Sequence, residues 1–199
     1  MVRADAVRNR ERVLAAAREA FARDGLAVPI DDIARAAGVG AGTVHRHFPT
    51  KETLYAAVLA DRVAALETLA RSYDDGEGLF RFIGGFAEHG AGNRALAEAL
   101  ARGGVDIQAE LGARSAALKQ AMADLLRVAQ RAGTARPDIT PDDLQALLGA
   151  VHLAVERAGG DPSATGRILG VLCDGLRRHD RGPASGGSVR ARVEPEPCG

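Results

Sequence analysis

Hydrogen-bond donors gather in the short segment 41–47, which has little apolar content. Thr43, His45 and Arg46 supply a hydroxyl, an imidazole and a guanidinium group close together in the chain. A threonine donates to a phosphate or meets a thymine methyl, and an arginine reaches the O6 and N7 acceptors of guanine or the DNA backbone. The chemistry that this segment suggests is the recognition of DNA.

The elements that would position these donors are two short helices joined by a glycine turn. The first helix is indicated by apolar residues at helical spacing, namely Ile30, Ile33, Ala34 and Ala37. Gly38-Val39-Gly40 follows, and Gly38 is free to adopt a positive φ and end that helix. Two such helices, the second rich in donors, are typical of a helix-turn-helix that enters the major groove. The alternative is an ordinary corner between helices with a solvated second helix.

The predicted DNA contacts lie in the second helix and at the start of the next one. Lys51 is expected to hold a phosphate together with the backbone amides and the dipole of its helix. Gly42 is costly inside a helix, and a close approach to DNA explains it. Arg46 is alternatively a solvated charge, and His47 equally caps its own helix. The full predicted set is Ala41, Gly42, Thr43, His45, Arg46, His47 and Lys51.

The segment 10–59 resembles the DNA-binding domain of the TetR family of one-component transcriptional repressors. Three stretches carry the resemblance: ERVLAAAREAFARDG (11–25), IDDIARAAGVGAGTVHRHF (30–48) and PTKETLYAAVL (49–59). The recurring family residues are Gly38-Val39, Thr43, His47-Phe48 and Lys51. Two positions depart from the family pattern. His45 stands where relatives often have tyrosine, and Asp31 stands where they often carry a basic or neutral residue.

The charge distribution agrees with a localised DNA-facing patch. The net charge is zero over 199 residues, which argues against a nonspecific nucleic-acid coat protein. Residues 1–51 hold nine basic and six acidic residues, whereas the remainder holds 17 basic and 20 acidic ones. The N-terminal excess of positive charge is therefore placed where the helix-turn-helix is expected.

Other classes of function find little support in the sequence. No phosphate-binding loop, G-x-S-x-G nucleophile or zinc-spaced Cys/His set is present, so we expect no enzyme, no cofactor and no metal. His152 and Glu156 are four residues apart and would supply half a metal site, but such a pair is more often a local ion pair or a hydrogen-bonded core histidine. Cys173 and Cys198 are too few for a disulfide framework. Without an apolar signal core or an 18-residue apolar run, the chain is expected to be cytoplasmic.

Helical periodicity continues along the chain, and no stretch alternates as a half-buried strand does. A long helix is expected after Pro49, with Thr50 as its N-cap, and its apolar stripe is long enough to link two domains. Other helices are expected over about 9–24, 79–89, 94–101, 113–132, 141–158 and 162–178. The predicted fold is all-α, with an N-terminal three-helix helix-turn-helix domain (1–50), a larger helical ligand-binding and dimerisation domain (51–179) and a disordered tail (180–199).

The resemblance implies a homodimeric repressor that binds double-stranded operator DNA and is released by a small-molecule effector of unknown identity. The last two helices are expected to pair two protomers, because their apolar stripes exceed what edge helices need. The effector is expected to contact apolar or amphipathic residues on inward-facing stripes, namely Phe82, Phe86, Leu118, Met122, Leu125 and His152. The alternatives are a ligand-independent DNA-binding activator or architectural factor, and, more remotely, an enzyme with an accessory helix-turn-helix.

Overall fold

The protein is helical throughout the part that the structure, a computed structural model, describes: residues 2–90, 93–102, 107–159 and 161–178. Nine helices and no strand occur in these ranges, so the all-α prediction is confirmed. They are α1 (Val2–Asp24), α2 (Ile30–Ala37), α3 (Ala41–His47), α4 (Lys51–Arg71), α5 (Gly78–Gly90), α6 (Asn93–Arg102), α7 (Ile107–Arg131), α8 (Pro141–Arg157) and α9 (Pro162–Leu176). Cys198 and the predicted tail 180–199 lie outside the described residues.

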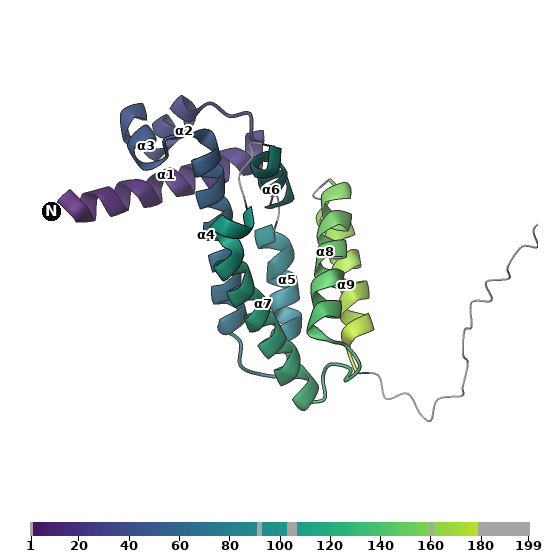
Figure 1. Cartoon of the computed structure of the whole chain (residues 1–199). Coiled ribbons are helices and arrows are strands. Elements are labelled where there is room, and N and C mark those ends of the chain that lie inside the picture. Colours follow the sequence, from purple (N-terminus) through teal and green to yellow (C-terminus); the bar gives the residue numbers. More distant parts are fainter. Residues whose placement is uncertain (1, 91–92, 103–106, 160, 179–199) are drawn as a thin grey trace, which may run out of the picture.

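The helices are arranged as a small unit at one end and a longer body below it (Figure 1). α1 crosses the N-terminal part of α4, and α2 and α3 lie beside it at the same end. α4, α5 and α7 run along the long axis, with the α8–α9 pair on one side. Among the described helices, none combines the length and apolar character needed to cross a membrane.

Local sequence signals set the ends of the helices that matter for the site. Gly38 ends α2 with φ 63°, as predicted, and the Val39 N–H donates to the Ala34 carbonyl over 3.0 Å. Thr50 caps α4 in a reciprocal arrangement with Thr53, in which each backbone N–H donates to the other residue's hydroxyl oxygen over 3.2 Å. α3 and the start of α4 are therefore fixed relative to each other by a short, capped connection.

Two hydrophobic cores organise the molecule. The first combines buried residues of α1 to α3 and of the N-terminal part of α4 with Leu96, Leu100 and Leu111. The second starts with Leu66 on α4 and continues through α5, the later part of α7, α8 and α9. The first core thus includes side chains from α6 and from the start of α7, and α4 takes part in both cores.

The end of α9 is fastened to the turns before α5 and after α7. Arg177 donates to both carboxylate oxygens of Glu77, over 3.1 and 2.9 Å, and its guanidinium lies 4.0 Å from the centre of the Phe80 ring. The Arg178 N–H donates to the Thr134 carbonyl over 2.8 Å, and the Thr134 hydroxyl donates to the Gly76 carbonyl over 2.5 Å. These contacts close the body at the end far from α3 (Figure 1).

Candidate DNA-binding surface

α3 rests on the first core through a few apolar side chains and exposes its polar ones. Val44 is fully buried, and Phe48, which directly follows the helix, is 2 % exposed. His45 and Arg46 are exposed, while Thr43 is half-buried. The spacing of Val44 and Phe48 therefore sets the rotation of α3, and this rotation turns the predicted donors outward.

Glycine at position 42 is not required by packing within the protein. A Cβ built on Gly42 meets nothing within 4 Å, and the residue is exposed on α3. Gly38 is different, because its positive φ demands glycine and a built Cβ would lie 2.5 Å from an Arg12 nitrogen. The exposed helix surface at Gly42 leaves room for a closely approaching partner.

The N-terminus of α4 lies beside α3 and adds cationic side chains to the same surface. Lys51 is half-buried, and its Nζ lies 5.8 Å from the centre of the Tyr55 ring. Arg10 of α1 places its guanidinium 5.5 Å from the centre of the Phe48 ring. A groove of about 440 Å³ is bordered by Arg10 together with His47 and Thr50. The structure thus brings α1, α3 and α4 together at one cationic surface.

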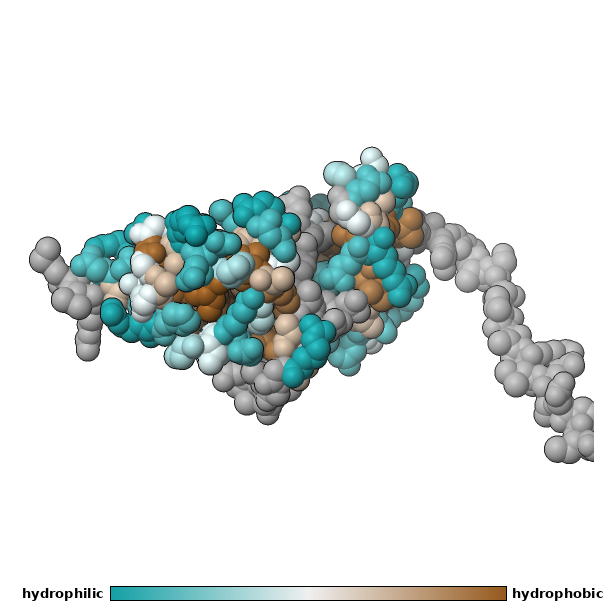
Figure 2. Space-filling model, turned by 90° about the horizontal axis from the view of Figure 1, so that it is seen from above, coloured by the Kyte–Doolittle hydropathy of each residue, from teal (hydrophilic) through white to brown (hydrophobic). Residues whose placement is uncertain are grey.

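The basic side chains of this surface are available to bind an anion. Among the described residues, no carboxylate pairs with Arg10, His45, Arg46, His47 or Lys51. Several other described arginines are paired with carboxylates, as in the Arg35–Asp32 contact of 2.7 Å on the neighbouring helix. Seen from this end of the molecule, hydrophilic residues cover much of the surface (Figure 2).

Two arginines that stabilise this region were not identified from the sequence. Arg12 donates to the Gly38 carbonyl over 3.2 Å and so braces the helix-turn-helix against α1. Arg18 of α1 pairs with Asp61 of α4 at 2.6 Å. Their partners are 26 and 43 residues away in the chain, and no local pattern in the sequence signals either contact.

The residues predicted to contact an effector all lie at the second core. Three are buried, Phe82, Met122 and Leu125, and two more, Phe86 and Leu118, pack against that core. The Phe82 and Phe86 ring centres are 6.0 Å apart, and the Phe86 and His152 ring centres are 6.3 Å apart. The structure therefore brings these side chains of α5, α7 and α8 into one region.

The buried Nε2 of His152 has no hydrogen-bond partner among the described residues. This nitrogen lies 3.3 Å from a Glu156 carboxylate oxygen, close enough for an ion pair but without hydrogen-bond geometry. Buried nitrogens without partners are uncommon in native proteins, because each costs desolvation free energy. Within the described residues, no group of three or more His, Cys, Asp or Glu side chains is arranged to hold a metal ion.

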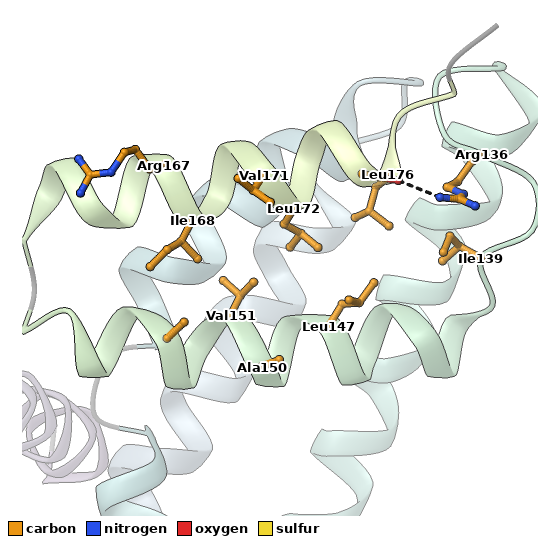
Figure 3. Close-up of a pocket in the computed structure, with 12 residues that line it drawn as sticks. Arg136, Ile139, Leu147, Ala150, Val151, Arg167, Ile168, Val171, Leu172 and Leu176 are labelled. Carbon is orange, nitrogen blue, oxygen red and sulfur yellow. Dashed lines mark hydrogen bonds between the residues drawn. The ribbon is translucent and has the colours of Figure 1, made fainter. Parts of the chain in front are cut away.

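An apolar groove of about 710 Å³ runs between α8 and α9 (Figure 3). Val151, Ile168 and Leu172 point toward one another across it, and Arg136 and Arg167 lie toward its two ends. Arg136 donates to the Gly175 carbonyl over 3.4 Å. Val171 and Leu147 both line this groove and are 75 % and 36 % exposed, so the groove presents apolar surface to water.

Comparisons with known proteins agree with this architecture. The family model "Bacterial regulatory proteins, tetR family" matches residues 13–58, and the model "Transcriptional regulator SbtR-like, C-terminal domain" matches residues 74–178. A search of curated proteins finds no match.

Several solved structures share the fold. A TetR transcription regulatory protein from Mycobacterium vanbaalenii is 41 % identical, with a TM-score of 0.73, and the match covers 89 % of this chain and 100 % of that one. The TetR regulator SCO0520 from Streptomyces coelicolor is 31 % identical, with a TM-score of 0.71 and coverage of 84 % and 98 %. The ketosteroid transcriptional regulator KstR2 of Mycobacterium tuberculosis, at 22 % identity, TM-score 0.57 and coverage of 85 % and 95 %, shares the fold. The chain belongs to the TetR family of bacterial transcriptional regulators.

Proposed function

We propose that the protein is a transcriptional repressor that binds operator DNA through α3 and leaves it when a small molecule binds the second core. The observation that carries the proposal is the cationic surface formed by α3 and the start of α4. Its donors are outward-facing, and none is paired with a carboxylate among the described residues. Membership of the TetR family supports the same role.

The donors of this surface are assigned different tasks. Arg46 and His45, exposed on α3, read base edges in the major groove, and Thr43 meets a phosphate or a thymine methyl. Lys51 holds a phosphate at the N-terminus of α4, where backbone amides and the helix dipole favour an anion. The open surface at Gly42, together with Ala41 and His47, allows α3 to approach the DNA closely.

The α8–α9 face pairs two copies of the chain. Val171 is 75 % exposed beside an apolar groove, so a second α8–α9 pair would remove a large apolar surface from water. An isologous dimer of this kind places two recognition helices on one side of a duplex. Their separation should be about 34–36 Å or a little more, matching successive major grooves.

The effector is a small, largely apolar molecule with a hydrogen-bonding group. Phe82, Phe86 and Leu118 would contact its apolar part, together with Met122 and Leu125 of the same core. The His152 Nε2, which has no hydrogen-bond partner among the described residues, would hydrogen-bond to the polar group of the effector. That bond would offset the desolvation cost of the buried nitrogen. Binding there lowers operator affinity, and operator lowers effector affinity by the same factor.

The proposal is tested by selecting bound sequences from a library of random duplexes with the purified protein. We expect a pseudo-palindromic site whose half-sites are about one DNA turn apart, or a little more. Failure to enrich any sequence from the library would contradict the proposed function. A duplex bound as a single half-site would instead contradict the dimer.

A further inference from the structure

α4 connects the two hydrophobic cores through a stretch in which no side chain is buried. Leu54, Tyr55, Val58 and Leu59 belong to the first core, and the next buried residue, Leu66, belongs to the second. All side chains of residues 60–65 are half-buried. Packing therefore holds α4 firmly on both sides of this stretch and less firmly within it, which makes residues 60–65 a joint between the two units.

Two polar contacts join the N-terminal part of α4 to α1 and to the loop that follows it. The Tyr55 hydroxyl donates to the Leu26 carbonyl over 2.6 Å, beside the edge-on contact of Phe21 with the Tyr55 ring at 5.1 Å. Farther along α4, Arg18 pairs with Asp61 at 2.6 Å. With a rise of about 1.5 Å per residue, the two points lie about 9 Å apart along the helix.

We propose that the Arg18–Asp61 ion pair is a latch that fixes the angle between the DNA-binding unit and α4. The buried α4 side chains of the first core lie between Leu54 and Leu59, and a polar contact beyond them at Asp61 lengthens the interface with α1 and so resists rotation of one helix against the other. Asp61 lies in the joint itself, so the latch attaches the joint to the unit that carries α3. A movement of α4 in the second core is thereby passed to the recognition helix.

The surroundings of the pair agree with a latch that opens and closes. Burial of Arg62, together with the nearby charge of Arg18, lowers the pKa of the Arg62 guanidinium. The contact between α1 and α4 is therefore partly shielded from water next to the Arg18–Asp61 pair. The Arg18 and Asp61 side chains remain 42 % and 38 % exposed. A pair of this exposure shifts an equilibrium about two- to fivefold, enough to bias an angle without locking it.

The test measures the distance distribution between spin labels on the two units by double electron–electron resonance. Labels are attached to cysteines introduced at two exposed positions, Ala36→Cys on α2 and Lys119→Cys on α7. The two native cysteines are removed by Cys173→Ser and Cys198→Ser. The labelled protein is diluted with unlabelled protein so that the distances measured lie within one chain. Arg18→Gln and Asp61→Asn should each broaden the distribution. The charge exchange Arg18→Asp with Asp61→Arg should narrow it again.

Glu67→Gln is the matched control, because it removes the 2.9 Å Arg71–Glu67 pair from α4 without touching α1. An unchanged distribution in Arg18→Gln and Asp61→Asn would overturn the latch, as would equal broadening in the control.

The latch variants should also bind the selected operator about two- to fivefold more weakly than the control. The role of the ion pair in passing a movement of α4 to the recognition helix rests on the proposed function. The spin-label measurement, however, needs neither DNA nor effector. A protein that bound no duplex would therefore overturn the proposed function and leave the latch standing.

Discussion

At the DNA-facing surface, the place of each donor determines what it reads. Arg46 is exposed on α3, and in the proposed complex its guanidinium would enter a groove, where its fork-shaped donors match guanine. Lys51 is half-buried at the start of α4, beside the capped N-terminus, and would meet the backbone of the duplex there. Removing each should change a different property of binding.

Replacing Lys51 with alanine should weaken the binding of all duplexes alike. A lysine on a phosphate contributes affinity through the release of counterions, which does not depend on sequence. The slope of log K against log salt should fall in magnitude by about 1. Fluorescence anisotropy titrations at several salt concentrations measure this slope, with Lys119→Ala on α7 as the control. An unchanged slope would remove Lys51 from the phosphate contacts.

Replacing Arg46 with alanine should relax the preference at one base position. The loss of a bidentate contact to guanine costs about 1–3 kcal/mol against the preferred base and little against the others. Competition among operator duplexes that each carry one base change measures this discrimination. Arg71→Ala, on the other half of α4, serves as the control. If every base change costs the variant as much as it costs the natural protein, Arg46 does not read a base.

At the scale of elements, the proposed dimer rests on the apolar surface of the α8–α9 pair. Val171→Glu should shift the protein from dimer to monomer, because a carboxylate would be buried without a partner at the interface. Light scattering at micromolar concentration measures the mass. The control variant Lys119→Glu, at an exposed position of α7, should leave the mass unchanged. A Val171→Glu protein with the same mass as the natural one would place the dimer interface elsewhere.

The contact between the end of α9 and the start of α5 should make stability depend on acid pH. Hydrogen bonds and charge from Arg177 lower the pKa of the Glu77 carboxyl below its ordinary value of 4.5. The stabilisation of the folded protein by the Arg177–Glu77 contact is therefore fully present above pH 4.5. It is lost as the pH falls through the lower pKa that Glu77 has in the folded state.

The variant Glu77→Gln should lose less of its free energy of unfolding than the natural protein when the pH falls below 4.5. Urea unfolding at a series of pH values measures this difference. Asp142→Asn, at an exposed carboxylate without an ion pair among the described residues, is the control. Parallel pH profiles for the natural protein and Glu77→Gln would show that the Arg177 contact is not maintained in solution.

Local patterns in the sequence predict the helices well where an apolar stripe or a cap is present. α2 and α3, the Gly38 turn and the Thr50 cap follow from neighbouring residues, because each depends on interactions within a few positions. α1 begins at Val2, earlier than the predicted position near 9, and α7 begins at Ile107 rather than near 113. The first residues of α1 carry no apolar stripe, so periodicity gives no signal for them.

Contacts between distant segments are what the sequence does not reveal. The Arg177–Glu77 contact spans 100 residues and the Arg18–Asp61 contact spans 43, and both are formed by exposed charges that occur throughout the chain. Likewise, the contribution of Leu96, Leu100 and Leu111 to the first core depends on how α6 and α7 lie against α4. For the candidate site, the sequence predicts which residues carry donors, and the packing of Val44 and Phe48 determines which of them face outward.

For the whole molecule, the proposed function requires that two distant regions respond to each other. The cationic surface lies at one end, the second core occupies the body, and α4 passes between them (Figure 1). An effector changes operator affinity only if it binds the two arrangements of these units with different affinity. This coupling has meaning only if α3 recognises a particular sequence, which is the central claim.

Sequence recognition by α3 is tested most directly by the ratio of the dissociation constants for a scrambled duplex and for the selected operator. The natural protein should bind the operator at least about a thousandfold more tightly than the scrambled duplex at physiological salt. The triple variant Thr43→Ala, His45→Ala and Arg46→Ala changes no buried side chain, so it should keep its fold and dimer mass while this ratio falls toward one. A triple variant that retained the full ratio would contradict sequence recognition by α3.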